Sequence, residues 1–411
     1  MNHLAIIVGA SHAGSQLALS LRQGGWCGRI LLIGDEHYLP YHRPPLSKDF
    51  LSGNKQADDL LIRPHALYEK NNIELQLDTN VLAIDRQQKQ ITLIQQSRQQ
   101  NIGYDKLAIC TGARIRLLPL PGIELSGIHY LRNLADVEAI RADLPAKGRG
   151  VIVGGGYIGL ETAAMLRKMG HDITVLEAAS QLLGRVAAKE IGEFYLALHR
   201  HHGVNVQTNI QIARFRGNKK IEHIELTDGT LISADFVVVG IGVLPNQELA
   251  AAAGLEVNNG ILVDEFAQTS DPDIVAAGDC TRFHHPLYGD IRLESVPNAT
   301  EQAKIAAATL NGKLQAHHSI PWFWSDQYDC KLQIAGLSQG YDEVIIRGDT
   351  TIKTENPPSF CAFYFKAGKL IAADCVNRPR EFMLTKLWLQ NRHTPSIDKL
   401  VDDSYELKKT D

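Results

Sequence analysis

The chain has 411 residues, of which 44% are hydrophobic and 21% are charged, and its formal net charge is −4 at pH 7. This length gives room for about two or three domains with sizeable cores. The net negative charge argues against a general nucleic-acid binder, which needs a dominant positive field. The sequence contains no run of about 18 apolar residues, so no membrane span is predicted.

The N-terminal region predicts a strand, a glycine-rich turn, a helix and a second strand. Leu4 to Val8 is a short apolar run, Ser15 to Gln23 has helical spacing, and two glycines end the helix. Arg29 to Ile33 then forms a second buried strand. The proline-rich segment YLPYHRPPLSKDFLSG cannot be regular throughout, so we expect a loop that becomes helical near Ser47.

The middle of the chain returns to this pattern. Strands are predicted from Ile73 to Leu77 and from Gln90 to Ile94, and LAICTGARIRLLPLPG adds an apolar strand that enters a loop. The order strand, glycine turn, helix and strand then recurs over Val151 to Val153, Tyr157 to Met169 and Ile173 to Leu176. This internal βαβ repeat predicts a second domain inserted inside the first.

The pattern changes from about Pro321. Leu332 to Leu337, Glu343 to Arg347 and the hairpin SFCAFYFKAGKLIAADCV, which turns between Lys366 and Lys369, predict an antiparallel sheet. A helix from Arg380 to Leu389 and a polar tail close the chain.

The predicted fold class is therefore α/β, with two Rossmann-like dinucleotide-binding domains and a small α+β domain at the C-terminus. The expected boundaries are 1–112 with 245–320 for the first domain, 113–244 for the inserted domain and 321–411 for the C-terminal domain.

The second glycine turn, GGGYIGLE, predicts an NAD site. Gly154 allows the tight turn, Gly156 lets the backbone approach a pyrophosphate, and Gly159 lets the helix pack closely on the strand. Glu177 ends the next strand, where an acidic group bonds the ribose 2′-hydroxyl, and two alanines follow it. No adjacent cation is present to meet a 2′-phosphate, so we expect NADH to be preferred over NADPH.

The first glycine turn, GASHAG, is less regular because Ser11 stands where the middle glycine is expected. Asp35 and Glu36 end the following strand at the ribose-binding distance. Taken alone, this pattern fits both a nucleotide-binding turn and a purely structural turn. Two such turns in one chain predict a flavoprotein, in which one domain holds the hydride acceptor and the other receives the nicotinamide donor.

Eight motifs together resemble one family. They are GASHAG, GDE with YHRPPLSK, ICTGA, HYLR, GGGYIGLE, TSDPDIVAAGDC, ESVPNA and PWFWSDQ, and they span essentially the whole chain in order. This ensemble resembles the NADH-dependent ferredoxin reductases, which belong to the glutathione-reductase-like flavoproteins and include putidaredoxin and rubredoxin reductases. The resemblance implies an FAD enzyme that takes a hydride from NADH and passes single electrons to an iron–sulfur ferredoxin or rubredoxin that feeds a monooxygenase or dioxygenase. The six scattered cysteines, with no C-x-x-C pair, favour reduced thiols in a cytoplasmic protein. We expect a monomer or weak dimer with no nucleic-acid or membrane partner.

The resemblance also implies which residues hold the cofactors. For FAD the expected contacts are Gly9, Ser11, His12, Ala13, Gly14, Asp35, Glu36, Arg43, Lys48, Val81, Thr111, Gly112, Arg132, Asp279, Val296 and Trp324. For NAD they are Gly154, Gly156, Tyr157, Ile158, Gly159, Glu161, Glu177, Arg185, Gly240, Ile241 and Gly242. Lys48 and Glu161 are the expected catalytic residues, since Lys48 can supply a cation near the flavin and pair with Glu161. An ordinary surface lysine is the alternative for Lys48.

Two alternatives share this fold. An NADH oxidase or disulfide reductase needs a thiolate near the flavin, and the loop from Tyr38 to Arg43 has no cysteine. Cys280 is expected to be a small buried thiol, and Cys361 and Cys375 are expected to be free buried thiols of the hairpin. The second alternative is a redox sensor resembling the apoptosis-inducing flavoproteins. A large charged insertion would favour it, and the C-terminal region has none.

Three further predictions concern residues outside the cofactor motifs. His199 and His202 can share a helix face, but with no carboxylate or cysteine beside them we expect a solvated, basic helix end and no metal site. Trp322 and Phe323 are expected to be core residues. Arg378 and Arg380 are hypothesised to form a basic docking surface for an acidic ferredoxin, with an ordinary surface role as the alternative.

Overall fold

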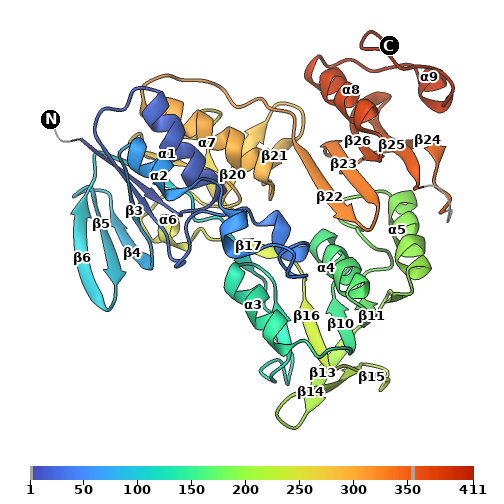
Figure 1. The fold of residues 1–411 in the computed structure, drawn as a ribbon. Helices are drawn as coiled ribbons and strands as arrows, with labels where there is room; N and C mark the ends of the chain where they lie inside the picture. The colour runs from blue at the N-terminus through green and yellow to red at the C-terminus, as the bar shows by residue number, and fades with distance from the viewer. Residues whose placement is uncertain (1–2, 353–356) are drawn as a thin grey trace. The chain divides into compact units, whose positions relative to one another are not determined.

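The computed structural model describes residues 3–352 and 357–411, and the chain divides into two compact units (Figure 1). Unit 1 comprises Met1–His42, Ala57–Arg114 and Val243–Pro321, and unit 2 comprises Arg43–Gln56, Ile115–Gly242 and Trp322–Asp411. Unit 2 therefore joins most of the inserted domain to the C-terminal region, and the expected boundaries of three domains stay a prediction.

Unit 1 is built on a parallel sheet of the Rossmann type, with strand order β19-β7-β1-β2-β3. The strands β1, β2, β7 and β19 are apolar runs that are largely buried on both faces, as parallel strands covered by other layers require, whereas the edge strand β3 is partly polar and partly exposed. The helices α1 and α7 pack against each other and contribute to one of these apolar layers. The bounds are β1 (Leu4–Val8), α1 (His12–Gln23), β2 (Arg29–Ile33), β3 (Ile73–Gln76), β7 (Lys106–Ile109), β19 (Ile274–Ala276) and α7 (Val296–Leu310).

Smaller elements complete unit 1. Strands β4, β5 and β6 form an antiparallel sheet, and β18, β20 and β21 form another small sheet. The bounds are η2 (Ala57–Leu60), α2 (His65–Lys70), β4 (Thr79–Asp85), β5 (Gln90–Gln95), β6 (Arg98–Gly103), β8 (Ala113–Ile115), β17 (Val243–Pro245), α6 (Glu248–Ala252), β18 (Ile261–Val263), β20 (Thr281–His285) and β21 (Gly289–Ile291).

Unit 2 contains a second parallel sheet, with strand order β12-β11-β10-β16-β9. Helix α4 follows β10 and packs on β10 and β11, which completes the repeated βαβ pattern. The bounds are η1 (Pro44–Ser47), β9 (Ile128–Tyr130), α3 (Leu134–Asp143), β10 (Arg149–Val153), α4 (Tyr157–Lys168), β11 (Asp172–Leu176), α5 (Lys189–His201), β12 (Asn205–Gln207), β13 (Ile212–Gly217), β14 (Ile221–Leu226), β15 (Leu231–Ser233) and β16 (Phe236–Val239).

The C-terminal part of unit 2 is an antiparallel sheet with strand order β22-β23-β26-β25-β24. Helix α8 packs on β23 and β26, and α9 packs on β24. The bounds are β22 (Trp322–Gln327), β23 (Cys330–Gly336), β24 (Glu343–Asp349), β25 (Ser359–Lys366), β26 (Lys369–Val376), α8 (Pro379–Gln390) and α9 (Ile397–Val401). The predicted fold class is thus confirmed, as is the predicted hairpin, which turns through Ala367 and Gly368 at positive φ.

Local predictions differ from the structure at three places. The first helix begins at His12, earlier than expected. The helix expected near Ser47 is a single 3₁₀ turn that begins with two prolines and ends at Lys48, whose backbone dihedrals (φ −128°, ψ −115°) are not helical. The tail is not simply polar, since it holds α9 and the buried Leu400 and Leu407. Over the described residues, no helix combines the length and apolarity needed to cross a bilayer.

Candidate functional site

The first glycine turn has the backbone geometry of an anion-binding turn. Gly9 has φ +113°, and a Cβ atom there would lie 2.1 Å from the carbonyl oxygen of Cys110. A Cβ at Gly14 would lie 1.9 Å from the carbonyl oxygen of Gly9, so only glycine allows α1 to approach β1 this closely. The first turn of α1 carries no acidic side chain, which leaves the positive end of the helix suited to a phosphate.

The other flavin-side predictions in unit 1 gather at one edge of its sheet. Asp35 follows β2, Thr111 and Gly112 follow β7, and Asp279 follows β19. Because these strands are parallel, their carboxyl ends lie at the same edge as the glycine turn, where ligands bind in such folds. The sheet therefore brings residues that are far apart in the sequence to one candidate flavin site.

The remaining members of the predicted unit 1 set have the following positions. His12 and Ala13 lie in the first turn of α1, Val81 lies in β4, and Val296 is the first residue of α7. Glu36 accepts a hydrogen bond of 2.5 Å from the hydroxyl of Tyr41.

Four predicted flavin-side residues belong to unit 2, namely Arg43, Lys48, Arg132 and Trp324. The guanidinium of Arg43 donates a 2.7 Å hydrogen bond to the carbonyl of Arg132, so these two residues are in contact. Trp324 lies in β22, half-buried, with its ring near those of Trp322 and Phe323. The cofactor contacts predicted for these four residues remain predictions.

The second glycine turn repeats the geometry of the first in unit 2. Gly154 has φ +112°, and a Cβ there would lie 2.4 Å from the carbonyl oxygen of Gly240. A Cβ at Gly159 would lie 2.2 Å from the carbonyl oxygen of Gly154, which is the close helix–strand contact predicted for this glycine. Gly156 caps α4 without a side chain, and no atom lies within 4 Å of the Cβ position there. Open space in front of uncapped N–H donors suits a pyrophosphate.

The predicted acidic residue touches this turn. Oε2 of Glu177 accepts the N–H of Gly155 at 2.6 Å, and Oε1 accepts the N–H of Ala179 at 2.7 Å. The carboxylate is thus fixed beside the glycine turn, where the Rossmann pattern places the acidic group that bonds the adenosine ribose.

The other predicted NAD residues lie around α4 and after β16. Gly240, Ile241 and Gly242 follow β16, and a Cβ at Gly242 would lie 3.4 Å from Nη2 of Arg185. In the first turn of α4, Ile158 is exposed. Tyr157 points its hydroxyl into the protein, where that oxygen has no hydrogen-bond partner among the described residues, and burial raises its pKa.

Glu161 is the centre of a buried polar cluster in unit 2. Its side chain is 3% exposed, and Oε2 accepts hydrogen bonds of 2.6 Å from both Nζ of Lys48 and Oγ of Ser47. Oε1 accepts a 2.7 Å bond from Oγ of Ser325 and a 3.3 Å bond from the N–H of Asp326. The expected pairing of Lys48 with Glu161 is therefore present. The two serines are a missed part of the cluster, although they lie within the quoted motifs YHRPPLSK and PWFWSDQ.

The cysteines have the environments that the sequence predicts. Cys280 is fully buried, and burial raises the pKa of its thiol to about 11. Cys361 and Cys375 lie opposite each other in β25 and β26 as buried free thiols. Burial also raises the pKa of the Cys375 thiol, and the described residues hold no cluster of three or more metal-ligand side chains.

The expectation of a solvated helix end is wrong for His199. Its side chain is fully buried, with Nε2 2.9 Å from the amide oxygen of Gln327 and Nδ1 3.2 Å from the hydroxyl of Tyr328. Burial lowers the pKa of His199 to about 4, so the ring is neutral. His202 stacks on Tyr328 at 3.7 Å between ring centroids. Residues from β22 and the turn after it cover this helix end.

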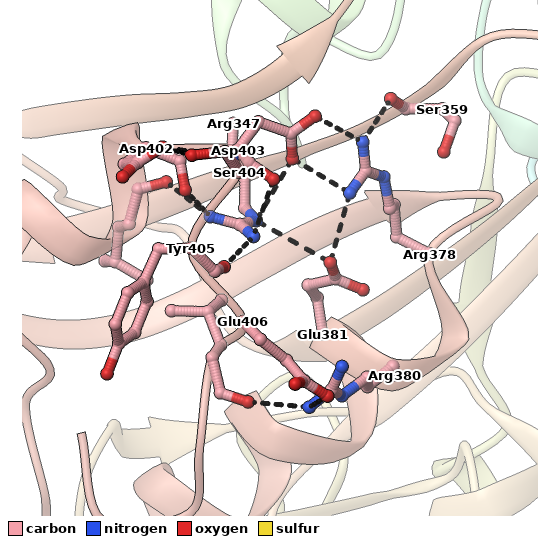
Figure 2. A network of polar contacts seen from close by, with 12 residues as sticks. Arg347, Ser359, Arg378, Arg380, Glu381, Asp402, Asp403, Ser404, Tyr405 and Glu406 are labelled. Carbon is pink, nitrogen blue, oxygen red and sulfur yellow. Dashed lines mark hydrogen bonds and ion pairs between the residues drawn. The ribbon is translucent and has the colours of Figure 1, made fainter.

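The basic docking surface hypothesised at Arg378 and Arg380 is not supported by the structure. Figure 2 shows Arg378 between two carboxylates, 3.2 Å from Glu381 and 2.9 Å from Asp403. Arg380 lies 2.7 Å from the carboxylate of Glu406. Carboxylates of the same C-terminal region therefore offset both positive charges.

Comparisons with known proteins cover nearly the whole chain. The pyridine nucleotide-disulphide oxidoreductase model matches residues 4–303, and the reductase C-terminal model matches residues 322–410. Putidaredoxin reductase from Pseudomonas putida is 43% identical over 99% of this chain and 96% of its own length. Rubredoxin-NAD(+) reductase from the same species is 36% identical over 91% and 96%, respectively. A crystal structure of a covalent putidaredoxin reductase–putidaredoxin complex matches with a TM-score of 0.93 at 43% identity, covering 98% of this chain and 96% of that chain.

Proposed function

We propose that this chain, which belongs to the pyridine nucleotide-disulphide oxidoreductase family, carries electrons from NADH to an iron–sulfur protein. Within that family it belongs to the ferredoxin reductases similar to putidaredoxin and rubredoxin reductase. The enzyme takes a hydride from NADH onto FAD and passes single electrons to a ferredoxin or rubredoxin, which feeds an oxygenase. The observation that carries this proposal is the end-to-end match to such reductases, including the C-terminal reductase region.

The chain's own residues fit two dinucleotides. Each unit has a parallel sheet with a glycine turn at its carboxyl edge and a helix whose first turn carries no acidic side chain. We assign FAD to the turn at Gly9 and NAD to the turn at Gly154. When bound, FAD supplies the conversion between a two-electron donor and a one-electron acceptor. The protein binds and orients the two cofactors and excludes water from the reaction.

We assign Lys48 and Glu161 to the hydride-transfer site. The ammonium group of Lys48 is held by the buried carboxylate and by the carbonyl of Pro44 at 3.3 Å, so the cation has a fixed position. A fixed cation next to a group that gains negative charge stabilises that charge without reorganisation. Lys48→Met should lower the rate of flavin reduction by NADH at least about tenfold, whereas Lys55→Met in the same segment should leave it unchanged.

The thiol-dependent alternatives have less support. An NADH oxidase or disulfide reductase of this fold needs a reactive cysteine, and the loop from Tyr38 to Arg43 has none. Cys280, which follows Asp279, is fully buried, and its thiol pKa is raised to about 11. A redox sensor of the apoptosis-inducing type would show slow NADH turnover even with an iron–sulfur acceptor present.

The test of the proposed function is electron delivery. The holoenzyme is mixed with NADH and cytochrome c, with and without a purified ferredoxin or rubredoxin. We expect cytochrome c reduction to depend on the iron–sulfur protein and to saturate with its concentration. NADH turnover that does not depend on the iron–sulfur protein but consumes oxygen or a disulfide would contradict the proposal. The cytoplasmic location and the monomeric or weakly dimeric state stay predictions.

A further inference from the structure

The loop from 177 to 188, which connects β11 to α5, is tied to the second glycine turn. Oε2 of Glu177 accepts the N–H of Gly155 at 2.6 Å. Further along the loop, the N–H of Leu183 donates to the carbonyl of Gly155 at 3.0 Å. One residue of the turn is therefore held from two points of the loop, so a displacement of the loop would also displace the turn.

The far end of this loop is held by the C-terminal sheet and by the segment that connects β23 to β24. Oγ of Ser338 donates a 3.0 Å hydrogen bond to the carbonyl of Val186. The N–H of Ala188, the residue that precedes α5, donates to the hydroxyl of Tyr364 at 3.2 Å. Both contacts join residues of the nucleotide-binding region to side chains about 150 or more residues later in the chain, within unit 2.

Tyr364 is in turn oriented by a buried acid. Its hydroxyl donates a 2.5 Å hydrogen bond to Oδ2 of Asp374, and both residues are fully buried. Because the hydroxyl proton is used for this bond, the lone pairs of the Tyr364 oxygen remain available to the N–H of Ala188. The three groups form a relay from backbone N–H to hydroxyl to carboxyl group, in which each bond polarises the next.

Burying the carboxyl group of Asp374 in this position costs free energy. Burial raises the pKa of Asp374 to about 7, and Oδ1 of the same carboxyl has no hydrogen-bond partner among the described residues. A pair of apolar residues would pack in a sheet without that cost. A requirement for stability alone therefore does not account for the Asp374–Tyr364 pair.

We propose that Tyr364, oriented by Asp374, and Ser338 are positioning residues of the NADH site, which makes the C-terminal sheet part of that site. They fix the loop that carries Glu177 and Arg185, the two side chains predicted to contact the nucleotide from this loop. The inference rests on the proposed function, because it assigns NADH to the turn at Gly154. It does not involve the docking of the electron acceptor.

This arrangement predicts which kinetic constant changes. The loop contacts the glycine turn, so loosening it weakens nucleotide binding. The groups assigned to hydride transfer, Lys48 and Glu161, have no hydrogen bond to Tyr364 or Ser338 among the described residues. A nucleotide that does bind should then react at the normal rate. Loss of either anchoring hydroxyl should raise the Kd for NADH and leave the limiting rate of flavin reduction unchanged.

The experiment is anaerobic stopped-flow reduction of the holoenzyme over a range of NADH concentrations. It compares the unmodified protein with Tyr364→Phe, Ser338→Ala and the control Tyr341→Phe. Tyr341 packs edge-on against Tyr364 with ring centroids 5.2 Å apart, but its hydroxyl has no hydrogen bond to the loop in the described part of the chain. We expect Tyr364→Phe and Ser338→Ala each to raise Kd by about two- to tenfold, with limiting rates within about twofold. Tyr341→Phe should change neither constant.

Either of two results would overturn the inference: an unchanged Kd in both folded anchor variants, or a lower limiting rate at unchanged Kd. Should Tyr364→Phe fail to fold, Ser338→Ala carries the same test, since its hydroxyl anchors the loop independently. Calorimetric titration of the oxidised holoenzymes with NAD+ measures nucleotide binding at the same site without any turnover. If NADH fails to reduce the unmodified enzyme, the proposed function is wrong, whereas equal NAD+ affinities in all variants would refute only the positioning role.

Discussion

Nζ of Lys48 lies 2.6 Å from Oε2 of Glu161, a residue 113 positions later in the chain. The side chain of Glu161 is almost completely buried, and that of Lys48 is 19% exposed. Two serine hydroxyls and a backbone N–H complete the shell of donors around Glu161. A buried charge of this kind is tolerable only while its partner remains in place.

A double-mutant cycle should reveal this dependence. Lys48→Met leaves the Glu161 carboxylate buried without a cation, and we expect the free energy of unfolding to fall by about 3 kcal/mol. Glu161→Gln added to Lys48→Met removes the uncompensated charge, while the amide can still be hydrogen-bonded by the two serines. The double variant should recover at least half of the loss, measured by urea unfolding at constant FAD. Additive losses would show that the two residues do not act as a pair.

The choice between NADH and NADPH should depend on Glu177. Its carboxylate is both the predicted partner of the ribose 2′-hydroxyl and the acceptor for the N–H of Gly155. We expect Glu177→Arg to lower kcat/KM for NADH by about tenfold or more and to raise the relative use of NADPH. Glu177→Gln should keep the bond to the turn and give a smaller loss with NADH. An unchanged NADH to NADPH ratio in the arginine variant would mean that the 2′-position is recognised elsewhere.

Asp374 should make stability depend on pH in an unusual direction. The pKa of this carboxyl rises from an ordinary value of 3.8 to about 7 on folding, because it is buried. Between these values the folded chain holds a proton that the unfolded chain has lost. This one group therefore lowers the free energy of unfolding by about 1.4 kcal/mol per pH unit as the pH rises, and it adds no further slope above about pH 7.

Asp374→Asn isolates this effect. The amide oxygen can still accept the hydroxyl of Tyr364, but the side chain no longer titrates. We expect the stability of the variant relative to the unmodified protein to increase from about pH 4 to about pH 7 and then to level off. Urea unfolding at several pH values measures this difference, in which the other carboxylates cancel. A difference that does not vary with pH would show that Asp374 is ionised throughout.

The two arginines of α8 and its cap should differ in their effect on folding. Arg378→Glu places a third carboxylate beside Glu381 and Asp403, and we expect it to lower the free energy of unfolding by about 2 to 4 kcal/mol. Arg380→Glu affects an exposed pair with Glu406, so its cost should stay below about 1 kcal/mol. Thermal melts at low and high salt compare the two variants. Equal, small shifts would mean that the network in Figure 2 contributes little to stability.

Much of the fold follows from local sequence patterns. The two βαβ units could be predicted because glycine turns, apolar runs and helix ends lie within short stretches around Gly9 and Gly154. The short antiparallel strands β4 and β6 were not predicted, since β6 is mostly exposed and polar and offers no apolar alternation. The helix expected near Ser47 is only a 3₁₀ turn, because the backbone leaves helical dihedrals at Lys48.

The parts of the site where distant segments meet were harder to predict from the sequence. The environment of His199 depends on Gln327 and Tyr328, and no local pattern reveals that they cover the helix end. The pairing of Lys48 with Glu161 was expected from the family resemblance and not from spacing. The position of Asp374 inside the apolar run LIAADCV indicates a buried acid. Its hydrogen bond to Tyr364, however, depends on the register of the hairpin and could not be predicted.

The most direct test of the central claim is an anaerobic titration of the purified holoenzyme with NADH, followed by the visible absorbance of the flavin. Bleaching complete at about one equivalent of NADH per FAD, as we predict, would show that the flavin is the sole redox centre, so that electrons must leave to an external acceptor. Consumption of about two equivalents would show that a pair of cysteines is reduced as well, and would contradict the assignment to the ferredoxin reductase reaction.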